Sequence, residues 1–188
     1  DFEVYEALKM ARANGWDRDL SENTQQKLRT KHGIIDEFRS KYTFYDIGFN
    51  IRPTEITGFL GNHQLKFLTQ NIQKRIENYS KILKACAKNN NLIKFNHNLH
   101  KSISNFAMVF IFKDESIMLK SKEKFDKNGI EIRPIIAGNM TKQPFYDKYN
   151  LPKQKLPNTE FVDKCGFYCG NYPDMTNEDL ELIIKSLN

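Results

Sequence analysis

Residues 48–53, which read Gly-Phe-Asn-Ile-Arg-Pro, have side chains suited to holding an anion. They place the amide of Asn50 and the guanidinium of Arg52 just before a helix that the pattern predicts from residue 54. Pro53 suits the first turn of that helix and requires extended backbone before it. Because backbone N–H groups and the helix dipole favour negative charge at such a start, the segment predicts an anion site.

A second candidate segment spans residues 129–139. Glu131 and Arg133 stand two residues apart in a predicted strand, so their side chains share one face. The strand then ends in a Gly-Asn turn at Asn139. From the residues alone two interpretations stay open: an ion pair at a strand end beside an ordinary turn, or polar groups that hold a ligand.

The cysteines and histidines predict no metal site. Cys165 and Cys169 lack the second pair that a structural zinc needs, so we expect ordinary thiols. His97 and His100 flank a turn rich in Lys and Asn and are expected to be solvated. The chain has no Gly-rich phosphate loop and no GxSxG or HExxH motif.

The first half of the chain predicts helices that could position these segments. A helical pattern from residue 1 ends at Asn14-Gly15, and the polar residues 17–45 show no clean period, which predicts a loop. Apolar residues spaced three and four apart over 54–88 predict one long helix or two in tandem, ended by Asn89. Gly58 and Gly61 within it favour close packing against another backbone.

The second half predicts alternating strands and helices, so the fold class is α+β: a long connecting helix followed by a small α+β domain. The strand at 106–112 is apolar on both faces and is expected at the centre of the sheet. Thr176 to Asp179 resembles a capping box for a last helix. The other expected elements are a helix at 116–127, a strand at 130–136, a polar connection over 137–164 and a strand at 167–172.

Composition excludes several classes of protein. The chain has 188 residues, of which 39% are hydrophobic, and no apolar run is long enough for a membrane span, so neither disorder nor a membrane location is expected. Its 29 Lys and Arg exceed its 23 Asp and Glu, but the basic residues alternate with acidic ones, which disfavours nucleic-acid binding. Three cysteines and no visible signal peptide favour the cytoplasm.

Several spaced motifs together resemble the DegT/DnrJ/EryC1/StrS family of sugar aminotransferases, which use pyridoxal phosphate. The second half resembles more particularly the branch that contains the 4-keto-6-deoxy-sugar 3-dehydratases. The motifs occur in the family's order over nearly the whole chain. They are residues 12–18 (RANGWDR), 48–55 (GFNIRPTE), 61–65 (GNHQL), 75–79 (RIENY), 129–139 (GIEIRPIIAGN), 156–160 (LPNTE) and 166–171 (GFYCGN).

This resemblance implies the C-terminal part of a fold-type-I enzyme that uses pyridoxal 5'-phosphate or pyridoxamine 5'-phosphate. Residues 1–53 would then be the tail of the large cofactor domain, 54–91 the connecting helix and 92–188 the small domain. The Schiff-base lysine, or the histidine that replaces it in the dehydratases, would precede Asp1, so no catalytic residue is expected in this chain, which should be inactive alone. As expected binding residues, the resemblance implies Asn50 for the cofactor phosphate of a neighbouring subunit, and Arg18, Arg52, Glu131, Arg133 and Asn139 for the nucleotide sugar.

The implied partners are a nucleotide-sugar substrate, glutamate as amino donor and a second copy in a homodimer. The expected reaction is transamination of an NDP-4-keto-6-deoxyhexose in polysaccharide biosynthesis of the lipopolysaccharide or O-antigen type. The alternatives are 3-dehydration of the same class of substrate, and a non-catalytic basic binding domain. Asn14 stands where the dehydratase of colitose synthesis has a histidine, and an amide is no general acid or base near neutral pH, which weakens the case for dehydration.

Overall fold

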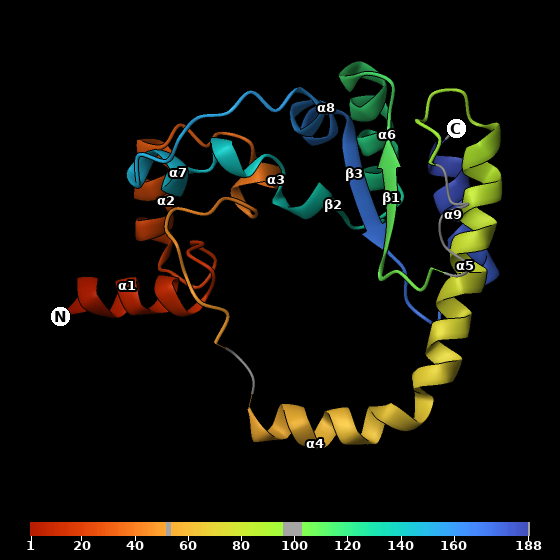
Figure 1. The fold of residues 1–188 in the computed structure, drawn as a ribbon, viewed down its shortest axis with the longest axis horizontal. Helices are drawn as coiled ribbons and strands as arrows, with labels where there is room; N and C mark the ends of the chain where they lie inside the picture. The colour runs from red at the N-terminus through yellow and green to blue at the C-terminus, as the bar shows by residue number, and fades with distance from the viewer. Residues whose placement is uncertain (52–53, 96–102, 188) are drawn as a thin grey trace. The chain divides into compact units, whose positions relative to one another are not determined.

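A computed structural model describes residues 1–51, 54–95 and 103–187 (Figure 1). The chain divides into two compact units, one formed by residues 1–58 with 137–157 and the other by 59–136 with 158–188. This grouping reflects packing within a single chain, and the expected division at residues 53 and 91 stays a prediction for the intact protein. Within the described part of the chain, no helix is long and apolar enough to cross a membrane.

The first unit begins with α1 (Phe2–Arg12), which ends where expected, since Asn14 and Gly15 adopt φ angles of 58° and 78°. The expected loop over 17–45 is wrong, because this stretch contains α2 (Glu22–Lys31) and α3 (Glu37–Ser40). The Ser21 hydroxyl caps α2 by accepting from the N–H of Thr24 at 3.4 Å. No residue of α2 is buried, so the helix has no apolar stripe for the pattern to reveal.

Two helices in tandem follow, which is one of the two arrangements that the spacing left open. They are α4 (Glu55–Gln64) and α5 (Leu68–Lys88), separated by one 3-10 turn, η1 (Leu65–Phe67), and Asn89 ends the second. No residue of α4 is buried. Nothing lies within 4 Å of a Cβ built on Gly58 or Gly61, so no described segment of the chain makes the close packing expected there.

The second unit contains a three-stranded antiparallel sheet of order β1-β3-β2, formed by β1 (Ala107–Ile111), β2 (Ile132–Pro134) and β3 (Gly166–Gly170). The expectation that residues 106–112 form the central strand is wrong, because β3 takes that place. β1 is nevertheless buried, and the Ile93 N–H donates to the Ile111 carbonyl on its outer edge at 2.8 Å. Apolar residues on both faces of a strand indicate that both faces are buried. They do not show that the strand is central, because an edge strand is equally buried when another segment covers its edge.

Three phenylalanines from three elements meet in the core of this unit. The ring of Phe167 on β3 lies 6.0 Å from Phe110 on β1 and 5.0 Å from Phe125 on α6 (Glu115–Lys127). Such tilted and edge-to-face ring pairs stabilise a core beyond the area they bury. Figure 1 shows α9 (Asn177–Leu187) beside both α5 and α6, against which it packs.

The start of α9 confirms the predicted capping box. The Thr176 hydroxyl accepts from the Asp179 N–H at 3.1 Å, and the Asp179 carboxylate accepts from the Thr176 N–H at 2.8 Å. The polar connection expected over 137–164 is wrong in detail. It contains three short helical pieces, which are η4 (Met140–Lys142), α7 (Pro144–Lys148) and α8 (Pro157–Cys165). The strand expected at 130–136 is shorter and passes into a 3-10 turn, η3 (Ile135–Ala137).

Candidate functional site

The segment that carries Asn50 is held against the end of α1 by main-chain hydrogen bonds. The Phe49 N–H donates to the Ala11 carbonyl at 2.6 Å, and the Asn14 N–H donates back to the Phe49 carbonyl at 2.9 Å. The Ile51 N–H donates to the Arg12 carbonyl at 3.2 Å. Asn50 itself is exposed, and its side-chain amide makes no hydrogen bond to another described residue. The backbone is therefore fixed while the amide stays available to a ligand.

Two glycines allow this close approach of the backbones. A Cβ on Gly15, whose φ is 78°, would lie 1.8 Å from the carbonyl oxygen of Asp46. A Cβ on Gly48 would lie 2.3 Å from the nitrogen of Gly15. Any larger residue at either position must push the Asn50 segment away from α1, so both glycines help to set where the amide points.

Asp46 anchors the same segment from its other side. Its carboxylate forms an ion pair with Lys148 and accepts from the Tyr149 hydroxyl at 2.6 Å, both near the end of α7. Burial alone would raise the pKa of Asp46, but the hydrogen bonds from Lys148 and Tyr149 lower it below its usual value. The carboxylate is thus ionised near neutral pH and ties residues 144–149 to the Asn50 segment.

Arg18 lies against two aromatic rings in the same unit. Its guanidinium carbon is 3.8 Å from the centroid of the Trp16 ring and 4.8 Å from that of Tyr42, and its Nε donates to the Lys41 carbonyl at 2.6 Å. Stacking of this kind fixes the plane of a guanidinium, and the hydrogen bond from Nε fixes its orientation within that plane. Arg18 is therefore a pre-oriented cation.

A buried ion pair that the sequence did not reveal lies beside Arg18. Asp17 is fully buried, and its Oδ2 accepts from Arg29 Nε at 2.8 Å. The Tyr45 hydroxyl is also buried, and burial, together with the charge of Asp17, raises its pKa to about 12. Because a loop was expected around Arg29, there was no basis for placing Arg29 beside Asp17. The opposite charges of the two residues were the only available signal.

The raised pKa of Tyr45 predicts a stability change at alkaline pH. Because the pKa in the folded state is about 12 and the ordinary value is 10.0, the unfolded chain loses this proton first, so stability falls as pH rises through that window. Denaturant unfolding just below and across this range should show the fall in the wild type and a smaller fall in Tyr45→Phe. Equal slopes in the two proteins would mean that Tyr45 titrates normally.

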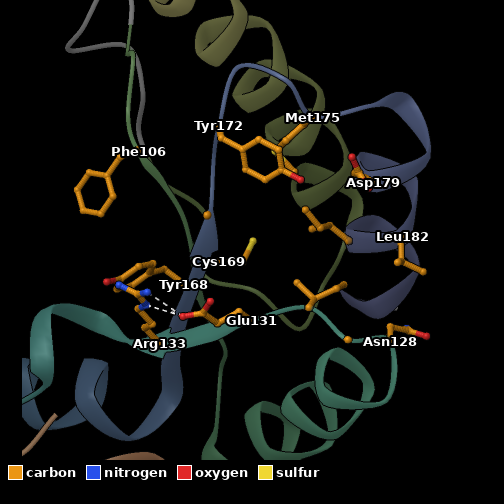
Figure 2. A pocket seen from close by; sticks show the side chains of 14 residues that line it. Phe106, Asn128, Glu131, Arg133, Tyr168, Cys169, Tyr172, Met175, Asp179 and Leu182 are labelled. Carbon is orange, nitrogen blue, oxygen red and sulfur yellow. Dashed lines mark hydrogen bonds and ion pairs between the residues drawn. The ribbon is translucent and has the colours of Figure 1, made fainter. Parts of the chain in front are cut away.

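Glu131 and Arg133 lie together at the mouth of a cavity of about 540 Å³ in the second unit. Arg133 donates to one oxygen of Glu131 from Nε at 2.9 Å and from Nη2 at 2.8 Å, as the dashed lines in Figure 2 show. Both side chains are largely exposed. The rings of Phe106 and Tyr168 line the same cavity, 6.1 Å apart and nearly perpendicular. The predicted shared face is therefore correct, and the cavity combines charged and aromatic groups.

Asn139 is almost fully buried in the first unit. Its Oδ1 accepts from the N–H of Thr141 at 3.0 Å and from the Thr141 hydroxyl at 2.8 Å, so the side chain caps the turn that begins η4. Its expected role in substrate binding stays a prediction. Arg52, together with Pro53, His97 and His100, lies outside the described residues.

The structure brings together no set of metal ligands within the described ranges, where no three His, Cys, Asp or Glu side chains lie close enough to share an ion. Cys86, Cys165 and Cys169 are free thiols. Burial raises the pKa of Cys169 to about 12, which keeps the thiol protonated and unreactive.

Comparison with known proteins identifies the sequence pattern. The sequence profile described as the DegT/DnrJ/EryC1/StrS aminotransferase family matches residues 3–188. The chain is 31% identical over its whole length to the GDP-4-keto-6-deoxy-D-mannose 3-dehydratase of Yersinia pseudotuberculosis and covers 47% of that protein. It thus spans about half the length of the curated relatives that it matches.

Solved structures show the same likeness. One is a GDP-4-keto-6-deoxymannose-3-dehydratase with a trapped PLP-glutamate geminal diamine, at 28% identity and a TM-score of 0.63. Another is a variant of this dehydratase with bound GDP-perosamine, at 29% identity and a TM-score of 0.64. In both comparisons all of this chain aligns with 48% of the other one.

Proposed function

Because the chain belongs to the DegT/DnrJ/EryC1/StrS aminotransferase family, we propose that it forms the C-terminal half of an enzyme that uses pyridoxal phosphate on a nucleotide-linked 4-keto-6-deoxyhexose. The observation that supports this proposal is that the family match covers residues 3–188 and that two of the family's motifs present polar side chains in the structure. The two segments that resemble the family's binding motifs hold an exposed amide and an exposed Glu–Arg pair on rigid backbone. Residues of this half would bind ligands rather than transfer protons.

Asn50 suits one contact to the cofactor phosphate. Its amide is exposed, and the backbone behind it is fixed by a close approach at Gly15 and Gly48 that a Cβ would block. An amide N–H on fixed backbone can donate to a phosphate oxygen of a neighbouring subunit's cofactor without reorganising. When bound, the cofactor supplies the electron sink for chemistry beside the sugar ketone, while the protein supplies placement and charge.

Arg18 and Arg133 suit the diphosphate and nucleoside part of the substrate. Arg18 is held on Trp16 and Tyr42 with its plane fixed, and a guanidinium binds phosphate oxygens in pairs. Arg133 is aligned by Glu131 at the rim of a cavity that Phe106 and Tyr168 also line, where a base could stack.

For the reaction itself, the similar dehydratases favour loss of the 3-hydroxyl as water. Transamination, the reaction expected from the sequence, is then the second candidate, and Asn14 is the residue that favours it. Asn14 lies in left-handed backbone with a φ of 58°, a conformation that suits asparagine better than most residues. Its amide cannot exchange a proton near neutral pH.

The intact protein, given 15N-glutamate and GDP-4-keto-6-deoxymannose, tests the proposal. We expect a sugar that has lost the oxygen at C3 and retains no labelled nitrogen, whereas transamination would leave the nitrogen on the sugar. Either product supports the use of glutamate and pyridoxal phosphate on this substrate class. Glutamate-dependent turnover of neither this substrate nor its CDP- and dTDP-linked analogues would refute the proposal.

Arg133→Lys should raise the KM for the nucleotide sugar and leave cofactor retention unchanged. Lysine keeps the charge but loses the planar fork, so paired recognition of oxygens is lost and the hydrogen bonds to Glu131 are weakened. The measurement is steady-state kinetics together with the absorbance of bound cofactor. Lys142→Arg, a substitution between the same cations at an exposed 3-10 turn, serves as control. An unchanged KM would remove Arg133 from the substrate site.

The connecting helices suit a contact with a second copy. On α4, Ile56 and Phe59 are 70% and 75% exposed, a degree of exposure that apolar side chains avoid unless a partner covers them. The open space around Gly58 and Gly61 leaves room for a second backbone. We therefore propose a homodimer with α4 at the contact, as a shared cofactor site requires.

A further inference from the structure

The segment 75–79 contains one residue whose role the fold leaves open. Asn78 on α5 donates to the Tyr172 carbonyl at 3.1 Å, and Asn171 donates to the Arg75 carbonyl at 3.1 Å, so the chain after β3 is tied to α5. The guanidinium of Arg75, in contrast, makes no hydrogen bond or ion pair with another described residue. Its Nε is fully buried. The Nε–H of this half-buried, charged side chain is thus enclosed, and no residue in the described part of the chain accepts from it.

Arg75 lines a polar cavity of about 500 Å³ formed by residues from the end of α4, η1, the first turns of α5 and the chain after β3. The side chains of Gln64, Gln70 and Asn71 line the same cavity and bring amide groups to it, and Lys74 brings a second cation. Its one carboxylate, from the exposed Asp174, forms no ion pair with either cation. Positive charge therefore exceeds negative charge around this cavity.

The chemistry of these groups defines the ligand that fits them. A guanidinium stays charged at any physiological pH, and a buried donor without a partner costs free energy that a ligand would recover. The Nε–H and Nη–H groups form a fork that matches the two oxygens of a carboxylate or phosphate. Side-chain amides add donors for further oxygens. An apolar or cationic ligand would leave Arg75 and Lys74 unpaired.

We propose that the cavity around Arg75 binds an oxyanion, with Arg75 as the paired donor and Lys74 as the supporting charge. The oxyanion comes from one of two sources. It is either a carboxylate side chain from another part of the intact protein or a free anion such as phosphate. This site is separate from Glu131 and Arg133, which line a different cavity.

The Nε–H NMR signal of Arg75 tests this directly in the intact protein with 15N-labelled arginine. The signal is assigned by its loss in Arg75→Lys and is followed first in chloride buffer and then during titration with inorganic phosphate. A signal that moves and saturates with phosphate identifies a free anion. A signal that ignores phosphate but shifts during an acid titration through the ordinary carboxyl range, at about pH 4, identifies a carboxylate of the protein. A signal that moves in neither titration overturns the proposal.

Three variants test which charged groups contribute to anion binding at Arg75. For a free anion, Lys74→Gln should weaken phosphate binding by about 10-fold, the loss of roughly one charge-assisted hydrogen bond. Lys84→Gln makes the same change of charge on an exposed turn of the same helix outside the cavity and should have no effect. Asp174→Asn tests the remaining explanation, which is that Asp174 pairs with Arg75. If the shift at about pH 4 disappears in this variant, Asp174 itself is the partner of Arg75, and the proposal is wrong.

Discussion

Gly15→Ala should destabilise the intact protein and also cause it to lose bound cofactor. The new Cβ would lie 1.8 Å from the carbonyl oxygen of Asp46, so residues 45–51 must move away from α1. The φ of 78° adds backbone strain. Steric overlap and strain together should cost roughly 3 kcal/mol or more. Because Asn50 lies on the displaced segment, cofactor retention should fall with stability.

Gly33→Ala is the matched control for this prediction. Gly33 also has a positive φ, 66°, but nothing described lies within 4 Å of a Cβ built there. It should therefore show the backbone strain alone, about 1 kcal/mol, with normal cofactor content. Denaturant unfolding and cofactor absorbance measure both effects. Equal losses in the two variants would show that the close approach at Gly15 does not hold the Asn50 segment.

The elements that the sequence predicted well are those with local signals. Asn14 and Gly15 end α1 because both tolerate left-handed backbone, and Thr176 with Asp179 begins α9 through a reciprocal cap. Helical structure over residues 54–88 was predicted because α5 carries a clear apolar stripe, of which Tyr79 and Ile82 are buried. Each of these features depends on residues close together in the chain.

The predictions that were wrong concern features for which the local sequence pattern is not informative. α2 was missed because a helix without a buried face has no hydrophobic period. β1 was expected at the centre because its residues are apolar, yet the pairing order depends on β3, more than 50 residues later. The polar composition of 137–164 concealed α7 and α8, since Pro144 and Pro157 begin those helices rather than exclude them.

In the candidate site, too, the features with a local signal were predicted and those that depend on distant residues were not. The shared face of Glu131 and Arg133 follows from strand geometry, so the sequence predicted it. The cavity that Phe106 and Tyr168 add beside this pair depends on β1 and β3 pairing, which no local pattern reports. The buried Asp17–Arg29 pair likewise requires α2 to exist before it can be inferred.

Asn50→Ala should weaken cofactor binding without unfolding the protein. The Asn50 side chain is exposed and makes no hydrogen bond to the described residues, so its removal costs the fold little. One hydrogen bond to a charged phosphate contributes about 1.5–3 kcal/mol, which is roughly 10- to 150-fold in affinity. Asn50→Asp should be weaker still, because a carboxylate of the same shape repels phosphate. Asn90→Ala, an exposed asparagine at the end of α5, is the control.

The most direct test of Asn50 as a ligand of the cofactor phosphate is the dissociation constant of pyridoxal phosphate for the intact apoprotein, measured by absorbance titration in these variants. We expect tight binding in the wild type and Asn90→Ala, weaker binding in Asn50→Ala and the weakest in Asn50→Asp, with equal stability in all four apoproteins. Added pyridoxal phosphate should restore activity to Asn50→Ala. Equal dissociation constants in Asn50→Asp and the wild type would contradict the placement of Asn50 at the cofactor phosphate.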